Sequence, residues 1–344
     1  MVKHKYISFE NNYIYNNNKK MKNEAIFIHN NNQVLLKNDK LGFPFKKINI
    51  KNNYKRNIFL YYIIIILNIL QKIKTDSDYI SITLSLSCNN FPLTNTDNYE
   101  IASSPSINQK IIKFKNNVIN DFNNFFKNIY CINKIEFSSL NYEGVVRAKG
   151  MFENCINLKE IDFGSFDASK ITDMSRMFYN CTSLTSINFG ENFKTSSLTN
   201  MEYMFSNCKS LETLDLSIFD TSKVLYMNNL FEDCIKINSL IISSFNTKNV
   251  IQMESMFQNC QSLTALNLNN FYTSSARQIY NMFYGCTGLI SIKIDNFDTF
   301  QITNFANLFY DCSSLQILNF KENFVTGLGI DMSYMFYSCN QLQN

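Results

Sequence analysis

The sequence contains no tryptophan, two histidines, three prolines and nine glycines in 344 residues. Both histidines, His4 and His29, lie near the N-terminus, so the remainder of the chain cannot use imidazole chemistry. This excludes Ser-His-Asp and Cys-His nucleophiles and most zinc sites there. Glycine and proline are too few for a collagen-like or low-complexity chain, and no glycine-rich phosphate loop is present. We therefore expect a protein that is not an enzyme and that has no cofactor and no bound metal.

Charge is distributed unevenly along the chain. Residues 1–74 hold 14 Lys/Arg against 3 Asp/Glu, whereas residues 75–344 hold 18 against 25. A basic leader thus precedes an acidic body. The body lacks the basic patch that nucleic-acid binding requires, so we expect no nucleic-acid partner.

The leader divides into two segments. Residues 1–56 are rich in Asn and Lys without a sustained period and are predicted to be an unfolded leader. Residues 57–74 contain a near-continuous apolar run from Ile58 to Leu70, which favours a transmembrane signal-anchor over a buried element or a signal peptide on a misassigned start. The larger Lys/Arg excess on its N-terminal side would keep the leader in the cytosol. The expected protein is membrane-anchored through 57–74, with its repeat domain extracellular.

The body is a tandem repeat. Nine cysteines recur at intervals of 24 to 27 residues, and most of these intervals are 26 residues. A fixed period of this length indicates a solenoid or a propeller. The cysteines are Cys131, Cys155, Cys181, Cys208, Cys234, Cys260, Cys286, Cys312 and Cys339.

Each unit combines two shorter periods. Met174, Met177, Phe178 and Cys181 have the spacing of one helix face, and a Leu-x-x-Leu-x-Leu run such as 211–216 has the period of a strand. From Cys155 to Cys339, the residue before each Cys is Asn, Asp, Gly or Ser, types that tolerate positive φ at a helix C-terminus. Segments such as 220–222, Asp-Thr-Ser, are predicted to cap the next helix. The predicted fold is an α/β solenoid of leucine-rich-repeat type, a curved right-handed coil with one short strand plus one helix per 26-residue repeat.

The repeat also resembles a known family. The string Met-Phe-x-x-Cys-x-x-Leu-x-x-Leu-x-Leu-x-x-Phe-Asp-Thr-Ser-x-Val-x-x-Met is similar to the repeat of BspA-like leucine-rich-repeat surface proteins of bacteria, mycoplasmas and protists. The resemblance covers residues 151–342. It implies a curved solenoid displayed on a cell surface and associated with adhesion or host contact.

The ends of the repeat array differ from its middle. Residues 75–130 are predicted to be a linker and N-terminal cap, with a strand at 79–87 and a helix at 108–129. Residues 131–344 are predicted to form about eight repeats. The chain stops inside a unit, so we expect a missing C-terminal cap, with a truncated gene favoured over an edge that meets a partner.

The strand face offers the candidate ligand-binding residues. With the strand leucines facing inward, the intervening positions form a polar ladder that could bind a protein or glycan through many modest hydrogen bonds, although a merely solvated face is equally compatible. Those residues are Asp162, Asn188, Asp215, Asn267, Lys293 and Asn319. The alternative surface carries Tyr179, Tyr284, Tyr310 and Tyr337.

Two further features of the repeats are a possible glycosylation sequon and the column of cysteines. Asn180 begins an Asn-Cys-Thr sequon and is a possible glycosylation site. The repeated cysteines are predicted to be buried free thiols, because equivalent residues on stacked helices lie too far apart to bridge, and a disulfide stays open if the column falls at the strand start.

These observations favour one function over a second. The first is a non-enzymatic cell-surface binding or adhesion protein whose solenoid meets a protein or glycan ligand on another cell or matrix. The alternative is an intracellular leucine-rich-repeat scaffold for protein partners, in which residues 58–70 would be buried in a soluble fold.

Overall fold

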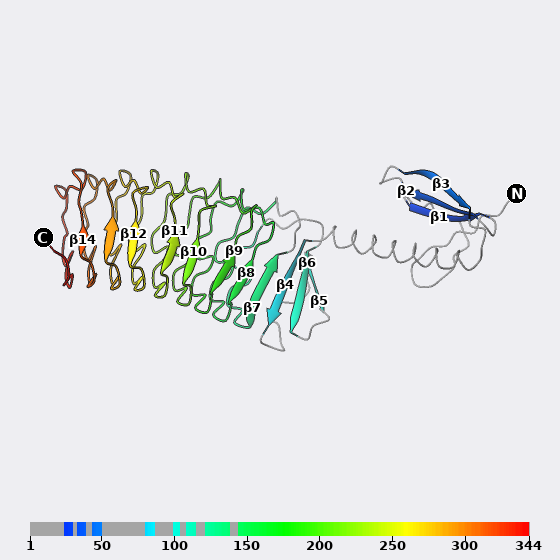
Figure 1. Ribbon diagram of the computed structural model, residues 1–344, viewed down its shortest axis with the longest axis horizontal. Helices are drawn as coiled ribbons and strands as arrows, with labels where there is room; N and C mark the ends of the chain where they lie inside the picture. The colour runs from blue at the N-terminus through cyan, green and yellow to red at the C-terminus, as the bar shows by residue number, and fades with distance from the viewer. Residues whose placement is uncertain are drawn as a thin grey trace. The chain divides into compact units, whose positions relative to one another are not determined.

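The structure, a computed structural model, describes residues 24–29, 33–38, 43–49, 80–86, 99–103, 108–114, 121–137 and 144–343. The chain divides into two compact units, Met1–Asp76 and Ser77–Asn344 (Figure 1).

The first unit contains a three-stranded antiparallel sheet. Its strands β1 (Glu24–His29), β2 (Gln33–Asn38) and β3 (Phe43–Asn49) pair in the order β1-β2-β3. They lie within residues 1–56, for which the composition predicts an unfolded leader. Apolar runs in β1 and β2 have the length of a strand, a signal that the surrounding Asn and Lys residues obscure.

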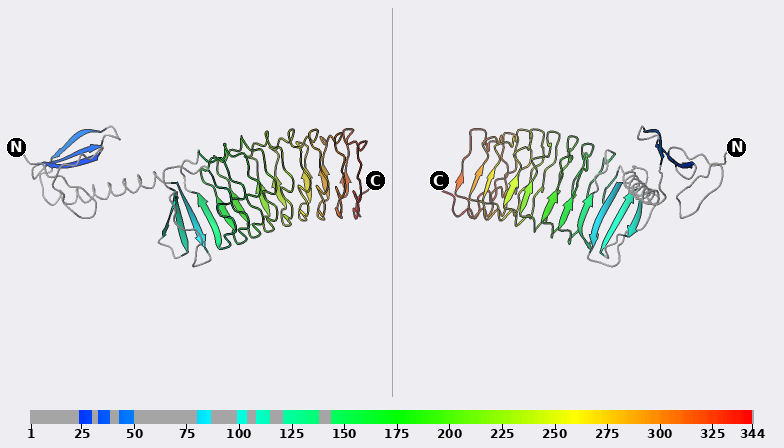
Figure 2. Two further views of the ribbon diagram at one scale, coloured as in Figure 1. Left: turned by 180° about the vertical axis from the view of Figure 1, so that it is seen from behind. Right: turned by 45° about the vertical axis from the view of Figure 1, so that its right-hand side comes forward.

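The second unit is a β-solenoid built from the 26-residue repeat (Figures 1 and 2). One short strand per coil pairs in parallel with the equivalent strand of a neighbouring coil, for example Glu160 with Ser186 and Thr213 with Ser239. The strands are β7 (Ile132–Phe137), β8 (Glu160–Asp162), β9 (Ser186–Asn188), β10 (Thr213–Asp215), β11 (Ser239–Ile241), β12 (Ala265–Asn267), β13 (Ser291–Lys293) and β14 (Ile317–Leu318).

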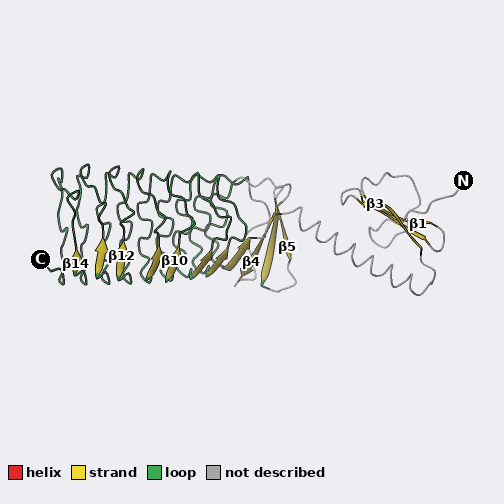
Figure 3. Cartoon of the chain, turned by 45° about the horizontal axis from the view of Figure 1, so that its top comes forward, coloured by secondary structure: helices red, strands yellow, loops and turns green. Residues whose placement is uncertain are grey.

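The predicted α/β solenoid with a helix per repeat is wrong. The part of the chain that the structure describes contains strands, turns and loops and no helix (Figure 3). From Cys155 to Cys339, the segment before each Cys is a run of turns in which two residues, five and one positions before the Cys, have positive φ, such as Arg176 at 58° and Asn180 at 59°. Two left-handed residues four positions apart are incompatible with an α-helix, because every helical residue needs negative φ.

Backbone hydrogen bonding explains why the turn run replaces the helix. Every second N–H donates to the next coil, as from Phe178 to the Met204 carbonyl at 2.9 Å. The intervening N–H groups close turns within their own coil, as from Cys181 to the Phe178 carbonyl at 3.1 Å. Each buried donor therefore has a partner without any bond of the helical i to i−4 type.

The Asp-Thr-Ser segments do not cap helices either. The buried threonine at this position of the repeat joins neighbouring coils: in the preceding unit, Thr195 Oγ1 donates to the Asp220 carbonyl at 3.0 Å and accepts the Asp220 N–H at 2.8 Å. The aspartate closes a local turn, with Asp220 Oδ1 accepting the N–H of Ser222 at 3.0 Å. The short polar side chains thus satisfy backbone groups at a turn and between coils.

The core consists of aligned columns, as the sequence periodicity predicts. Met174, Met177, Phe178 and Cys181 are all fully buried. From Phe152 to Phe336, the Phe three positions before the Cys of each unit stacks on its equivalents in adjacent coils, for example Phe257 on Phe283 at 5.7 Å and 4°. Such pairs contribute about 0.5–1.5 kcal/mol beyond the burial of their area.

An antiparallel cap precedes the solenoid. Strands β4 (Ile80–Leu86), β5 (Tyr99–Ser103) and β6 (Gln109–Phe114) pair in the order β5-β6-β4, and β4 pairs with β7. β4 coincides with the strand expected at 79–87, whereas the helix expected at 108–129 is wrong. The N-terminal part of segment 108–129 is β6, where Ile112 is buried and Ile111 is partly exposed. Further along this segment, Asn124 and Asn128 have positive φ.

Among the described residues, no helix is long and apolar enough to cross a membrane. This finding removes the support for the transmembrane helix and for the membrane-anchored localisation with an extracellular repeat domain. The expected anchor at 57–74 itself lies outside the described residues. Its near-continuous apolar run, 58–70, is also shorter than the roughly 20 residues that a spanning helix needs.

Candidate ligand-binding surface

The predicted ligand-binding residues form one column along the strand face. Asn188, Asp215, Asn267, Lys293 and Asn319 are exposed, and Asp162 is partly exposed. Parallel register aligns Asp162 with Asn188 and Asn267 with Lys293. Equivalent residues on paired strands therefore repeat about every 4.8 Å across the sheet.

Most of these side chains are oriented by the turn that follows the strand. Oδ1 of Asp162 accepts the N–H of Gly164 at 2.9 Å, Asp215 that of Ser217 at 2.8 Å, and Asn267 that of Asn269 at 3.1 Å. Hydrogen bonds from Ser217 hold the pKa of Asp215 below its ordinary value. In each of these residues, one side-chain oxygen accepts a backbone hydrogen bond and stabilises the turn, a role that the strand pattern did not predict.

Charge changes along the strand face. At the N-terminal end, Lys134 pairs with Glu136 at 2.8 Å and with Glu160 at 3.4 Å. The column has the acidic Asp162 in β8 and Asp215 in β10, with Asn188 between them in β9, whereas it has Ile241 in β11, Asn267 in β12 and Lys293 in β13. The surface therefore has an acidic half and a neutral to basic half.

The strands do not form one continuous sheet. The ladder runs through β5-β6-β4-β7-β8-β9, then β10-β11, then β12-β13-β14. The central residue of each strand reflects these breaks. Leu214 and Leu266 are 4% and 6% exposed, whereas Ile187 and Leu240, each in the last strand of its block, are partly exposed. The candidate residues are consequently grouped in three sets, with Asp215 separated from both neighbours in the column.

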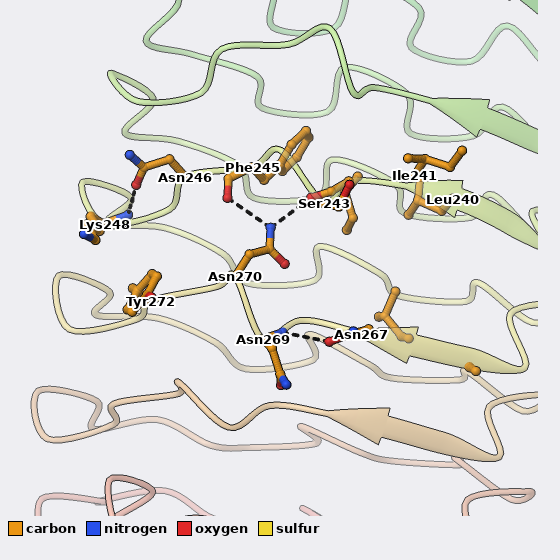
Figure 4. A pocket seen from close by; sticks show the side chains of 13 residues that line it. Leu240, Ile241, Ser243, Phe245, Asn246, Lys248, Asn267, Asn269, Asn270 and Tyr272 are labelled. Atoms are coloured by element: carbon orange, nitrogen blue, oxygen red, sulfur yellow. Dashed lines mark hydrogen bonds between the residues drawn. The ribbon is translucent and has the colours of Figure 1, made fainter.

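A groove of about 760 Å³ lies between β11 and β12 (Figure 4). Its walls follow the strands and the turns after them, from Leu240 to Lys248 in one coil and from Ala265 to Tyr272 in the next. Asn267 is the one predicted ligand-binding residue that lines it. No feature of the sequence predicts this groove, because the spacing of Cys234, Cys260 and Cys286 is regular across it.

The tyrosines of the alternative surface also fall into two separate groups. Tyr284 stacks on Tyr310 at 4.6 Å, and Tyr310 stacks on Tyr337 at 5.0 Å. Tyr179 lies elsewhere, under the guanidinium of Arg176 at 3.8 Å. Because stacked rings cover each other's faces, the tyrosine ladder presents mainly ring edges and hydroxyls to a ligand.

Asn180 is a constrained glycosylation candidate. Its Nδ2, the atom to which a glycan would be attached, donates to Asn154 Oδ1 at 2.9 Å, and Thr182 Oγ1 donates to the Ile156 carbonyl at 3.3 Å. Both side chains of the sequon therefore make hydrogen bonds between coils. Glycosylation at Asn180 stays a prediction.

The cysteine column is a ladder of thiols, as predicted. Each buried Sγ–H donates to the carbonyl of the core Phe in the preceding coil, for example Cys234 to Phe205 at 3.1 Å. Burial raises the pKa of Cys234 to about 12. Cys131 differs, since it is disulfide-bonded. Within the described residues, no group of three or more His, Cys, Asp or Glu is placed to hold a metal ion.

The fold and this surface define a repeat-containing β-solenoid protein. Residues 96–213, 185–289 and 264–344 each match the family described as "Mycoplasma protein of unknown function, DUF285", and the chain belongs to that family. The match names this family and not the BspA-like leucine-rich-repeat proteins. No curated protein matches the chain.

Proposed function

We propose that this chain is a non-enzymatic binding protein of the adhesion type, whose solenoid presents its strand face to a protein or glycan ligand. One observation carries the proposal. The strand-face residues are exposed or partly exposed, yet the turns that follow the strands hold most of them in a defined orientation, as Ser217 does for Asp215. A preorganised polar surface loses little conformational entropy on binding, which favours recognition by many modest contacts.

Two further features support this function. The resemblance of the repeat to BspA-like surface proteins is consistent with adhesion. The core columns of Met, Phe and Cys are apolar and filled, so the conspicuous repeated residues serve stacking and leave recognition to the exterior. The proposal includes no membrane anchor.

The test is a steric block of the strand face. The full chain, with Ser186→Arg and Thr213→Arg, is applied to a glycan array and to immobilised matrix proteins beside the unmodified chain. Both residues are exposed first positions of strands, so folding should be retained while binding falls about tenfold or more. The matched control is Gln261→Arg with Asn340→Arg, exposed positions that directly follow a Cys.

A second variant separates the two candidate surfaces. Tyr284→Ala, Tyr310→Ala and Tyr337→Ala together remove the stacked tyrosines. Loss of binding in this variant, with normal binding by the strand-face variant, would move the site to the tyrosine surface. Absence of binding to any probe by the unmodified chain would contradict the proposed function.

A further inference from the structure

The groove between β11 and β12 is a place where the backbone ladder is interrupted. At the ends of β10 and β12, the next N–H donates to the following coil, from Leu216 to the Ile241 carbonyl at 2.9 Å and from Leu268 to the Lys293 carbonyl at 2.8 Å. In the described chain, Ile242 makes no such bond to Asn267. The exit end of β11 is therefore unpaired with the next coil.

The entry end shows the same interruption. Ser239 N–H donates to the Glu212 carbonyl at 3.2 Å, and Ser291 N–H donates to the Thr264 carbonyl at 3.4 Å. No equivalent bond of the described residues joins Ala265 to the preceding coil. Because β11 and β12 also belong to different sheets, their facing edges leave backbone donors and acceptors open along the whole strand.

The neighbouring coils remain joined on their other side. Ser255 N–H donates to the Tyr280 carbonyl at 3.0 Å, which continues the turn ladder across these two coils. Below the groove, Asn270 Nδ2 donates to the carbonyls of Ile242 and Phe245, at 2.9 and 3.0 Å (Figure 4). The groove is thus a fixed opening confined to the strand side.

The residues that line the groove indicate which chemical groups a ligand would place there. Leu240 is partly exposed, in contrast to the buried central residues of β10, β12 and β13, so an apolar group beside it would complete the core. Lys248 is the one charged side chain that lines the groove, and it lies beyond the C-terminal end of β11. Its Nζ is 5.0 Å from the centre of the Tyr272 ring.

We propose that this groove binds an extended peptide segment of a protein partner, which adds to the sheet as a strand parallel to β11 and β12. The segment places an apolar residue beside Leu240 and a carboxylate, at its C-terminal end, beside Lys248. Strand addition of this kind draws its affinity from backbone hydrogen bonds and its specificity from alternate side chains. The inference rests on the proposed function and specifies the class of partner.

The hydrogen-bonding groups of the groove favour a peptide over a glycan. The amide oxygens of Asn246 and Asn267 already accept backbone N–H groups, from Lys248 at 3.2 Å and Asn269 at 3.1 Å, and Asn270 Nδ2 is committed to two carbonyls. What stays open is the regularly spaced backbone of two strands. A peptide backbone matches that spacing, whereas a sugar does not.

The probe is a synthetic peptide with the sequence of residues 210–220, which carries a strand of this repeat, a central leucine and an aspartate at its C-terminal end. A fluorescein-labelled form is titrated with the full chain, and anisotropy is recorded. We expect saturable binding that falls about tenfold when the amides copied from Thr213–Asp215 are N-methylated. Lys248→Ala should weaken binding about fivefold, whereas Lys223→Ala, an exposed lysine outside the groove, should not change it.

Three results would overturn the inference: no binding of the peptide, equal binding of its N-methylated form, or displacement of the peptide by maltoheptaose, a neutral oligosaccharide. Hydrogen exchange gives a second readout, because the Leu240 amide should become protected when the peptide is bound. The Ser186→Arg and Thr213→Arg variant leaves the groove residues unchanged. Ligand binding that depends on these positions, together with failure of the peptide, would therefore reject the strand addition and retain the proposed function.

Discussion

The Thr221 hydroxyl holds two coils together through a single residue, Asn246. It donates to the Asn246 carbonyl at 3.1 Å and accepts the Asn246 N–H at 2.7 Å. Thr221 is 1% exposed, so water does not substitute readily for either bond. The equivalent Thr247 makes the same pair of bonds with Tyr272. The repeated threonine is therefore a connection between coils.

Thr221→Val should destabilise the solenoid. The valine keeps the shape but leaves a buried donor and a buried acceptor of Asn246 without partners, at a cost of about 2–4 kcal/mol. Thr221→Ser retains the hydroxyl and is the matched control, with an expected cost near 1 kcal/mol for the lost methyl group. Urea denaturation followed by circular dichroism measures both. Equal stability of the two variants would show that the hydroxyl is not bonded between coils.

Ser255→Gly should stabilise the protein or leave it unchanged. Ser255 has a φ of 55°, and glycine adopts this conformation without the roughly 1 kcal/mol cost borne by other residues. In a helix, the same substitution would lower stability by several tenths of a kcal/mol. The sign of the change in the free energy of unfolding thus distinguishes the turn run from a helix. Ser255→Val should be strongly destabilising, because a β-branched residue is poorly accommodated at positive φ.

Glu254 should make stability depend on pH. Burial, with a contribution from Glu202, raises the pKa of Glu254 above its ordinary value. The folded chain therefore holds this proton more strongly than the unfolded chain, and stability decreases as pH rises from about 4.3 through the raised pKa. Glu254→Gln should remove that decrease, so its thermal midpoint should exceed that of the unmodified chain at pH 8 by a few degrees.

Glu153 is the opposite case and serves as the comparison. Burial raises the pKa of Glu153, but hydrogen bonds from Arg176 and Lys127 outweigh burial and lower it overall. Its contribution to stability is present above the unfolded pKa and is lost as pH falls through the folded pKa. Glu153→Gln should lower the thermal midpoint at pH 8. The same sign for both variants at that pH would contradict these assignments.

The thiols should react in an order set by burial. Cys234 is fully buried with a pKa of about 12, whereas Cys339 is only half-buried. Because the thiolate is the reactive form, a disulfide reagent at pH 8 should label Cys339 first and the seven buried thiols only on unfolding. Peptide mapping after timed labelling gives the order. Rapid labelling of Cys234 in the folded chain would show that the ladder is open to solvent.

The sequence predicts the core of the repeat well. Met174, Met177, Phe178 and Cys181 are buried as expected, because apolar spacing reports which residues face inward. The same spacing did not distinguish a helix from a turn run. Positive φ directly before each Cys from Cys155 to Cys339 was expected and is confirmed, but the second left-handed position holds residues such as Arg176 and Tyr203, whose types give no signal.

The sequence predicts which residues of the candidate surface are exposed, but it predicts less well the hydrogen bonds that orient them and the groove beside them. Alternation within the strands correctly placed Asp215 and Lys293 at exposed positions. The bond from the Ser217 N–H to Asp215 joins residues two positions apart, a spacing that is visible in the sequence. The groove between β11 and β12 was not predictable, since it arises from how two regular coils separate at Leu240 and not from any change in repeat length.

The alignment of Thr, Phe and Cys columns depends on a constant number of residues per turn of the coil. Gain or loss of one entire unit keeps all these columns in line, whereas insertion of a single residue displaces every column beyond it unless a loop absorbs the extra length. The 27-residue interval between Cys181 and Cys208 is such an accommodation, and the ladder breaks there, between β9 and β10. Recombination between repeats therefore offers a way to lengthen or shorten this protein in whole-unit steps without disturbing how it folds.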